Sequence, residues 1–119
     1  MIVNLTQHNP TPLQTLEGVG PRLVGVPELL TFEKNPSSMG LRERVALLVV
    51  EASRASSVGG EVMVGGAPAL MALLDPALRK VGLVPVYSFS ARRKVETLQP
   101  DGTVSIQQVF EHAGWWPQP

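Results

Sequence analysis

Short apolar runs alternate with segments of helical periodicity along most of this chain, and Gly and Pro residues separate them. The clearest apolar runs predict strands at Met1–Leu5, Glu61–Val64 and Leu83–Phe89. Successive strands joined through a helix are expected to be parallel strands of one sheet, connected by right-handed crossovers. The sequence therefore predicts an α/β fold, a single Rossmann-like domain of three layers built around a mainly parallel sheet.

Helical signals are strongest between Leu41 and Ala55, where apolar residues recur every three or four positions. A shorter helix is predicted to begin at Thr11-Pro12, a cap followed by a first-turn proline, and to stop at Gly18. The stretch from Gly18 to Pro36 contains Gly-Pro and Val-Pro steps around a small apolar cluster. We expect either a short strand or a turn of helix there.

A further helix is predicted to follow Pro68 and to stop at Gly82. Within it, Asp75-Pro76 resembles a new cap with a first-turn proline, which predicts a kink or a restart. In the strand that follows, Pro85 lacks a backbone donor and therefore favours a position near a sheet edge or a bulge.

The pattern changes after Ser90, because two segments with alternating apolar residues flank a turn. Lys94–Leu98 and Thr103–Phe110 surround Gln99–Gly102, which predicts an antiparallel hairpin that extends the sheet. The segment 111–119 then closes the domain. Its two tryptophans, Trp115 and Trp116, are expected to cover either core edges or a partner surface.

Length and composition restrict the classes of function. A chain of 119 residues with 44% hydrophobic content suits one domain, residues 1–119. The formal net charge is zero, so no overall field favours DNA or anionic lipid, and general DNA binding is disfavoured. No segment has the apolar length of a membrane span or the pattern of a signal peptide, so a cytoplasmic protein is expected. The absence of cysteine excludes disulfides and thiolate chemistry.

Three polar loops follow the three predicted strands. In a parallel sheet, ligands bind outside the carboxyl ends of the strands, so these loops are expected to converge on one site. The expected ligand is an anion, and the predicted ligand-binding residues are Thr6, Gln7, Asn9, Gly65, Gly66, Ala67, Ser88, Phe89 and Arg93. For Thr6, capping of a helix is a competing role.

Two of these segments have chemistry suited to phosphate. Gly65 and Gly66 would let backbone N–H groups approach a ligand at the start of a helix, although a simple tight turn explains them equally well. The loop has neither the Lys of a Walker motif nor a GxGxxG pattern. Arg92-Arg93-Lys94 is the longest basic run, and it fits either a phosphate clamp or a solvated strand end.

The candidate catalytic residues are His8, Ser90 and Arg92. His8 in the first loop suits a general acid or base, or a purely structural role that holds the loop. No GxSxG elbow or triad pattern surrounds Ser88 or Ser90, so hydrogen bonding to a ligand is the favoured role of these serines. His112 has no assigned place. No cofactor is expected, and no metal site either, because the two histidines lack carboxylates at ligand spacing.

The opening Ile2–His8, with Thr11 and Gln14 following, resembles the strand, polar His loop and T-x-x-Q helix start of small CRISPR-associated Rossmann-like proteins, a group that includes ring nucleases. The segments Gly65–Pro68 and Phe89–Arg92 also resemble GGAP and FSxR segments in small proteins of phages and mobile elements.

The first resemblance implies a nucleotide-binding protein that binds or cleaves cyclic oligoadenylate without metal, a phosphodiesterase of antiviral defence. It also implies a homodimer around a symmetric ligand, in which His8 and Arg92 are doubled. The alternative is a non-catalytic phage or mobile-element protein that acts through a protein partner, using its hairpin and Trp115-Trp116. The sequence leaves both alternatives open.

Overall fold

The predicted apolar runs are the central strands of the computed structural model, which describes residues 1–116. β1 (Ile2–Leu5) pairs in parallel with β3 (Glu61–Val64), and β3 pairs in parallel with β4 (Val84–Leu98). β2 (Val19–Arg22) lies outside β1 and parallel to it, while β5 (Val104–Trp116) runs antiparallel to β4. The sheet order is β2-β1-β3-β4-β5. The predicted α/β fold, a mainly parallel sheet with an antiparallel C-terminal pair, is confirmed.

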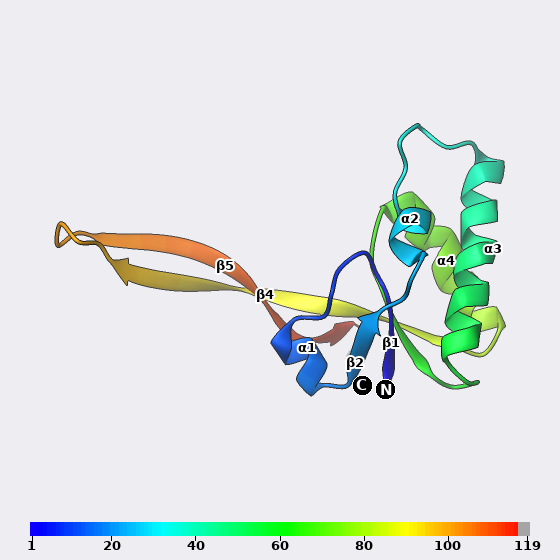
Figure 1. Ribbon diagram of the computed structural model, residues 1–119, viewed down its shortest axis with the longest axis horizontal. Coiled ribbons are helices and arrows are strands. Elements are labelled where there is room, and N and C mark those ends of the chain that lie inside the picture. The colour runs from blue at the N-terminus through cyan, green and yellow to red at the C-terminus, as the bar shows by residue number, and fades with distance from the viewer. Residues whose placement is uncertain (117–119) are drawn as a thin grey trace.

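Helices connect the parallel strands and cover the sheet. These are α1 (Pro12–Leu16), α2 (Val26–Leu30), α3 (Ser38–Ala55) and α4 (Pro68–Lys80). Figure 1 shows α2, α3 and α4 grouped together, with α1 apart from them beside β2. This separation follows from handedness, because the chain moves from β1 to β2 in one direction and from β2 to β3 in the other.

Local signals set the ends of these helices. Thr11 and Gln14 form a capping box that starts α1. Ser37 caps α3, which begins three residues before the predicted Leu41. The stretch 18–36 contains both a strand and a helical turn, β2 and α2. Pro76 lies inside a single helix, so the predicted restart is wrong, and Asp75 accepts hydrogen bonds from Arg79 and Tyr87 instead of capping.

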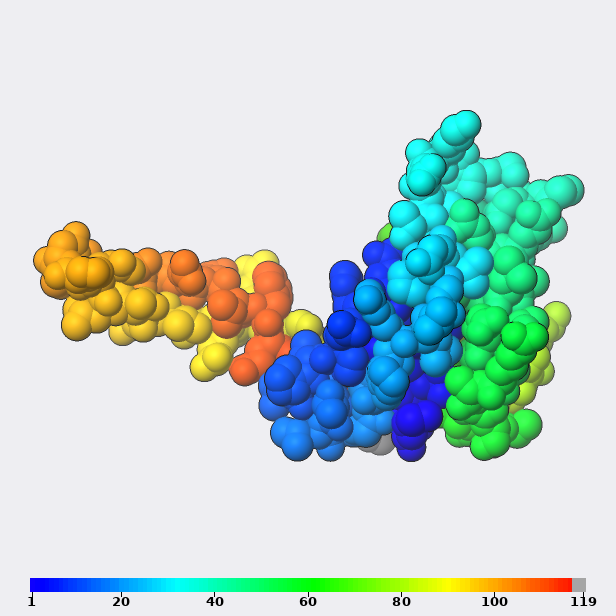
Figure 2. All heavy atoms as spheres, in the orientation of Figure 1, coloured from blue at the N-terminus to red at the C-terminus, as the bar shows by residue number. Residues whose placement is uncertain are grey.

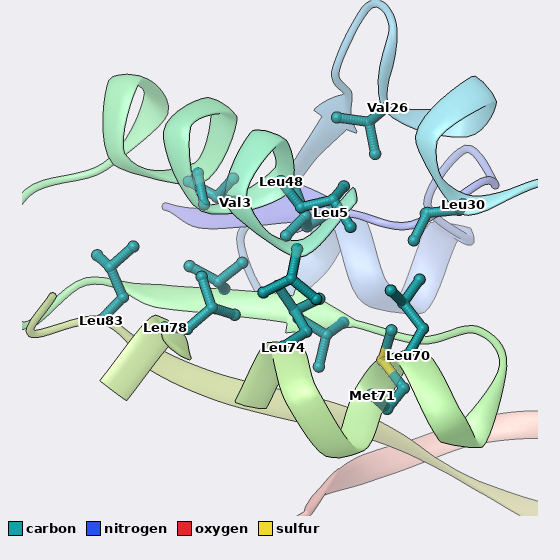
Figure 3. Close-up of a cluster of buried hydrophobic side chains, with 14 residues drawn as sticks. Val3, Leu5, Val26, Leu30, Leu48, Leu70, Met71, Leu74, Leu78 and Leu83 are labelled. Carbon is teal, nitrogen blue, oxygen red and sulfur yellow. The ribbon is translucent and has the colours of Figure 1, made fainter. Parts of the chain in front are cut away.

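The core has two parts, one on each face of the sheet. Alternate residues of a strand point to opposite faces, so Val62 and Val64 contribute to the larger cluster and Met63 to the smaller one. The larger cluster packs against α2, α3 and α4, and its central side chains include Leu5, Leu48 and Leu74 (Figure 3). Ile2, Val19, Met63 and Val86 form the smaller cluster, with Trp115 packed against it.

The C-terminal pair extends beyond this body as a two-stranded arm. The predicted strand at 83–89 and the first hairpin strand at 94–98 are one continuous strand, β4. Its pairing with β5 runs from Tyr87↔Trp116 to Leu98↔Val104. We call residues 91–111 the arm. Figures 1 and 2 show it as a narrow projection, and the molecule measures 56 × 34 × 24 Å. The predicted turn at 99–102 is confirmed at its tip, where the Gln99 N–H donates to the Thr103 carbonyl.

The two tryptophans differ in environment. Trp115 covers the edge of the smaller cluster, as one of the two predictions for it required. Trp116 is exposed and makes an edge-to-face contact with Phe89, with ring centroids 5.4 Å apart. The predicted closing segment 111–119 is described only as far as Trp116, and residues 117–119 lie outside the described residues.

Pro85 pairs with Val62 of β3, and the described pairing of β4 with β5 begins at Tyr87. The edge or bulge position expected for Pro85 stays a prediction, because the position opposite it in β5 lies outside the described residues. Of the helices in residues 1–116, none is long and apolar enough to cross a lipid bilayer.

Candidate functional site

The strand order places a crevice beside β1 and β3. The chain leaves β1 toward β2 on one side and returns past β1 to β3 on the other, which makes this the topological switch point of the sheet. A cleft of about 560 Å³ opens there. Its lining comes from the loops after β1 and β3, from the start of α1 and from β4: Thr6, Gln7, His8, Asn9, Thr11, Gln14, Met63, Val64, Gly65, Gly66, Tyr87, Ser88 and Ser90. Two of the three polar loops predicted to converge do so, whereas the third, predicted at 88–93, is part of the continuous strand β4 and brings only Ser88 and Ser90 to the cleft.

A buried asparagine shapes the loop after β1. Asn4 is 0% exposed, and its Oδ1 accepts from the Thr6 backbone N–H at 3.1 Å and from the Thr6 hydroxyl at 2.6 Å. Its Nδ2 donates to the His8 carbonyl oxygen at 3.0 Å. These bonds close a tight turn over Thr6 to His8, because one side chain satisfies several backbone groups. Thr6 therefore holds the loop as well as lining the cleft.

Gln7 connects this loop to its neighbours. Its Nε2 donates to the Leu30 carbonyl at the end of α2, and its own carbonyl accepts from Arg22 of β2. His8 and Asn9 are exposed at the rim. Of the first loop, these two side chains are the most accessible to a ligand.

The loop after β3 leads directly into a helix. Gly66 has a φ of 153°, which L side chains rarely adopt, so glycine is favoured there. Pro68 occupies the first turn of α4, and the N-cap residue Ala67 makes no side-chain capping bond. Pro68 has no N–H and the Leu70 N–H donates to the Ala67 carbonyl, so of the first three α4 residues only Ala69 has an N–H without a helical partner.

Ser88 is the centre of a polar chain that the sequence does not reveal. Its Oγ lies 2.5 Å from Nδ1 of His112, and Gln14 Nε2 donates to the same Oγ at 3.2 Å. His112 Nε2 lies 3.2 Å from Oε2 of Glu17, which also accepts a hydrogen bond from the Trp115 indole N–H. The His112 side chain is only 2% exposed.

Tyr87 adds a second polar group to the cleft wall. Its hydroxyl donates to Asp75 Oδ2 at 2.7 Å, and Arg79 Nε donates to Asp75 Oδ1 at 2.7 Å. Burial and the bond to Asp75 raise the pKa of Tyr87 to about 12, so this phenol stays protonated at neutral pH. Burial alone would raise the pKa of Asp75, but its bonds to Arg79 and Tyr87 outweigh burial and lower it.

Some predicted site residues lie away from the cleft. Ala67 and Phe89 do not line it, and neither arginine of the basic run reaches it. Arg92 places its guanidinium over the Phe110 ring, 5.6 Å from the centroid, and Arg93 pairs with Glu111 at 3.1 Å. Both belong to the arm, because β4 continues outward past Ser90.

The cleft is polar but uncharged. Among the described residues, its lining includes no Asp, Glu, Lys or Arg. Within residues 1–116, His and carboxylate side chains nowhere gather in a group of three or more that could hold a metal ion. The donors that the cleft offers a ligand are therefore hydroxyls, amides, imidazole and backbone N–H groups.

Fold and site together define an α/β protein with a polar cleft at the switch point of its sheet. The chain belongs to the uncharacterized protein MJ1673 family, whose family model matches residues 1–116. The match covers the body and the arm alike. No curated protein and no solved structure matches the chain.

Proposed function

We propose that the cleft binds a nucleotide-like anionic ligand. The observation that carries this proposal is the position of the cleft, at the carboxyl ends of β1 and β3 where the chain reverses direction. Parallel α/β sheets bind mononucleotides and dinucleotides at such points, because loops and helix starts meet there. A volume of about 560 Å³ is sufficient for one nucleotide-sized group.

Backbone N–H groups are the proposed hydrogen-bond donors to the phosphate of the ligand. The loop at Gly65 and Gly66 approaches the cleft without Cβ obstruction, and α4 begins directly after it. Because the described lining carries no cationic side chain, we expect the body alone to bind weakly and the remaining charge to come from elsewhere.

A second copy of the chain is the proposed source of that charge. A homodimer around a symmetric ligand such as cyclic oligoadenylate would place Arg92 of each arm near the ligand of the pair. Arg92 is the better candidate, because Arg93 already pairs with Glu111. This choice of ligand rests on the resemblance of the first fifteen residues to ring nucleases.

Cleavage of such a ligand would be metal-independent. A ribose 2′-hydroxyl would attack the adjacent phosphorus, the bond to the 5′-oxygen would break, and a cyclic phosphate would form. His8 at the rim is the proposed group that takes the hydroxyl proton or protonates the leaving oxygen, and Ser90 would bond a phosphate oxygen.

The test uses radiolabelled cyclic tetra-adenylate and hexa-adenylate without metal, with binding followed by gel shift and cleavage by chromatography. We expect His8→Ala to abolish cleavage and Arg92→Ala to weaken binding about tenfold. Ser57→Ala, an exposed residue of the α3–β3 loop, is the matched control. Absence of binding and cleavage at micromolar wild-type protein would overturn the proposal for these ligands.

The arm supports a second candidate function, capture of a protein partner. Its register places exposed apolar side chains on one face of the ribbon: Leu98, Val104, Ile106 and Phe110. A two-stranded ribbon is marginally stable in water on its own, so a partner that covers this face would also stabilise the arm. Phe89 and Trp116 are also exposed, nearer the body, on the opposite face of the ribbon.

This second candidate is tested by quantitative pull-down from the source cell, with mass-spectrometric identification of the bound protein. Ile106→Ser with Phe110→Ser, or deletion from Trp115 onward, is expected to abolish capture. Thr97→Ala with Gln107→Ala alters the opposite face of the same ribbon and should leave capture unchanged. Equal loss with both pairs of substitutions would contradict recognition through the apolar face.

A further inference from the structure

A hydroxyl, an imidazole and a carboxylate are bonded in series at the wall of the cleft. Ser88 lines the cleft, its Oγ lies 2.5 Å from Nδ1 of His112, and Nε2 of the same ring lies 3.2 Å from Glu17 Oε2. Glu17 follows α1, Ser88 is in β4 and His112 is in β5, so three separate elements position them. The nucleotide proposal uses none of these three residues.

The hydrogen bonds around the ring specify where its proton lies. The Glu17 carboxylate only accepts, so His112 carries its proton on Nε2 and donates it to Glu17. Nδ1 is then an acceptor, and the Ser88 hydroxyl donates to it. Gln14 Nε2 donates to the same Ser88 oxygen, which leaves this oxygen one further lone pair. That lone pair is the one a nucleophile needs.

An irregularity in the pairing of β4 with β5 orients the His112 imidazole toward Ser88. In the register His112 lies opposite Ser90, yet its Nδ1 meets Ser88. The pairing shifts between Ser88 and Ser90, and β5 has one extra residue there. Gly114 in this bulge has a φ of 134°, a conformation that glycine adopts without strain. Bulges commonly redirect a side chain in this way beside active sites.

We propose that Ser88 is an activated nucleophile, with His112 as its general base and Glu17 as the positioning residue that fixes the ring. A serine hydroxyl, an imidazole and a carboxylate bonded in series are the components of the hydrolase triad, here with the two ring nitrogens exchanged, because Nδ1 faces the serine and Nε2 the carboxylate. The small exposed fraction of His112 keeps water from competing for Nδ1.

The substrate class is an uncharged carboxylic ester. Phosphoryl transfer develops charge that enzymes neutralise with Arg, Lys or metal. Within one chain the described cleft lining contains no such side chain, so the nucleotide proposal needs Arg92 of a second copy. An acyl centre needs only hydrogen-bond donors for its oxyanion. The loop at Gly65 and Gly66 and the side-chain amide of Gln14 line this cleft and carry N–H donors.

The reaction balances without a co-reactant other than water. Ser88 Oγ forms a bond to the acyl carbon while its proton passes to His112 Nδ1. The bond from the acyl carbon to the alcohol oxygen then breaks, and that oxygen takes the proton from Nδ1. Water repeats the sequence on the acyl-serine, releases the carboxylic acid and restores the hydroxyl of Ser88.

The test combines a fluorophosphonate probe, which labels activated serines, with turnover of p-nitrophenyl butyrate by the intact chain. We expect one adduct per chain, located on Ser88 by peptide mass spectrometry. Ser88→Ala should abolish labelling and reduce turnover at least about 1,000-fold. Ser105→Ala, another strand serine, is the matched control and should leave both unchanged. Absent labelling, or labelling that survives Ser88→Ala in a folded variant, would overturn the proposal.

A second variant separates positioning from simple structural support. Glu17→Gln keeps an oxygen acceptor but removes the charge, at a side chain that is 43% exposed and therefore tolerant of substitution. We expect kcat to fall about 100-fold with KM nearly unchanged, and Glu17→Asp to recover part of the loss. Unchanged kcat in Glu17→Gln would overturn the triad. If Ser88-dependent turnover is faster with bis(p-nitrophenyl) phosphate than with p-nitrophenyl butyrate, the assignment of a carboxylic ester as the substrate is wrong.

Discussion

The two halves of β4 contain similar side chains in very different surroundings. Val86, in the body, is 4% exposed, whereas Leu98, near the tip of the arm, is 74% exposed. Val86 packs in the smaller cluster, which Trp115 covers, while the far half of the strand has β5 as its one described neighbour. The comparison shows that an apolar strand residue stabilises the fold only where a second layer covers it.

The largest difference between body and arm is expected from removal of a core side chain. Leu74 of α4 is fully buried in the larger cluster, so Leu74→Ala loses transfer free energy and leaves a cavity. We expect a loss of about 3 kcal/mol in the free energy of unfolding, measured by urea denaturation. Leu73→Ala, at the exposed neighbouring position, serves as the control. Equal losses in both variants would contradict the assigned core face of α4.

A smaller loss is expected from the polar part of the body. Asn4→Ala would leave the Thr6 N–H and the His8 carbonyl without their buried partner. The expected cost is about 2 kcal/mol, since unsatisfied buried groups lose the full hydrogen bond. Thermal unfolding followed by circular dichroism measures it, and Asn35→Ala in an exposed loop is the control. A neutral Asn4→Ala would mean that the loop after β1 does not depend on this network.

A third prediction concerns the pH dependence of the bond between α4 and β4. The folded protein holds the pKa of Asp75 below its ordinary value of 3.8, so the stabilisation is complete above that value and is lost as pH falls through the folded pKa. We expect Asp75→Asn to cost about 1 kcal/mol at pH 7. The difference in free energy of unfolding between Asp75→Asn and the wild type should decrease as the pH becomes acidic. Denaturation at a series of pH values checks this, and a gap independent of pH would contradict the ionised bond.

The smallest effect is expected in the arm. Ile106 is 62% exposed, so Ile106→Ala should change the free energy of unfolding by less than about 0.5 kcal/mol in dilute protein. Repeating the measurement at increasing protein concentration sharpens the comparison. If a second copy covers the apolar face, the cost of Ile106→Ala will grow with concentration.

Much of the fold could be predicted because its signals are local. Apolar runs, helix caps and the turn at Gln99–Gly102 each depend on a few neighbouring residues. The meeting of the loops after β1 and β3 followed from parallel strands alone, whereas the predicted loop at 88–93 was wrong because β4 continues through it. The projection of the arm was not predictable, because alternating apolar residues look alike in a covered sheet and in a bare ribbon.

The candidate site was predictable only in part, for a related reason. The sequence identifies His8, Gly65 and Ser88 as loop or strand-end residues, and the structure brings them to one cleft. The contact of His112 with Ser88 depends on strand register and on a bulge, which no local pattern specifies. Glu17 meets His112 across 95 positions, so a single sequence contains no signal for the pair.

The same separation along the chain has a consequence for the order of folding. Contacts between α3 and α4 close short loops, whereas Gln14 reaches Ser88 across 74 positions and Glu17 reaches His112 across 95. Closing a long loop costs more conformational entropy than closing a short one, so contacts across long loops tend to form late. On dilution from denaturant, helical circular dichroism should therefore recover first. The fluorescence change of Trp115 as it docks beside Glu17 should follow more slowly, and with it the completed cleft.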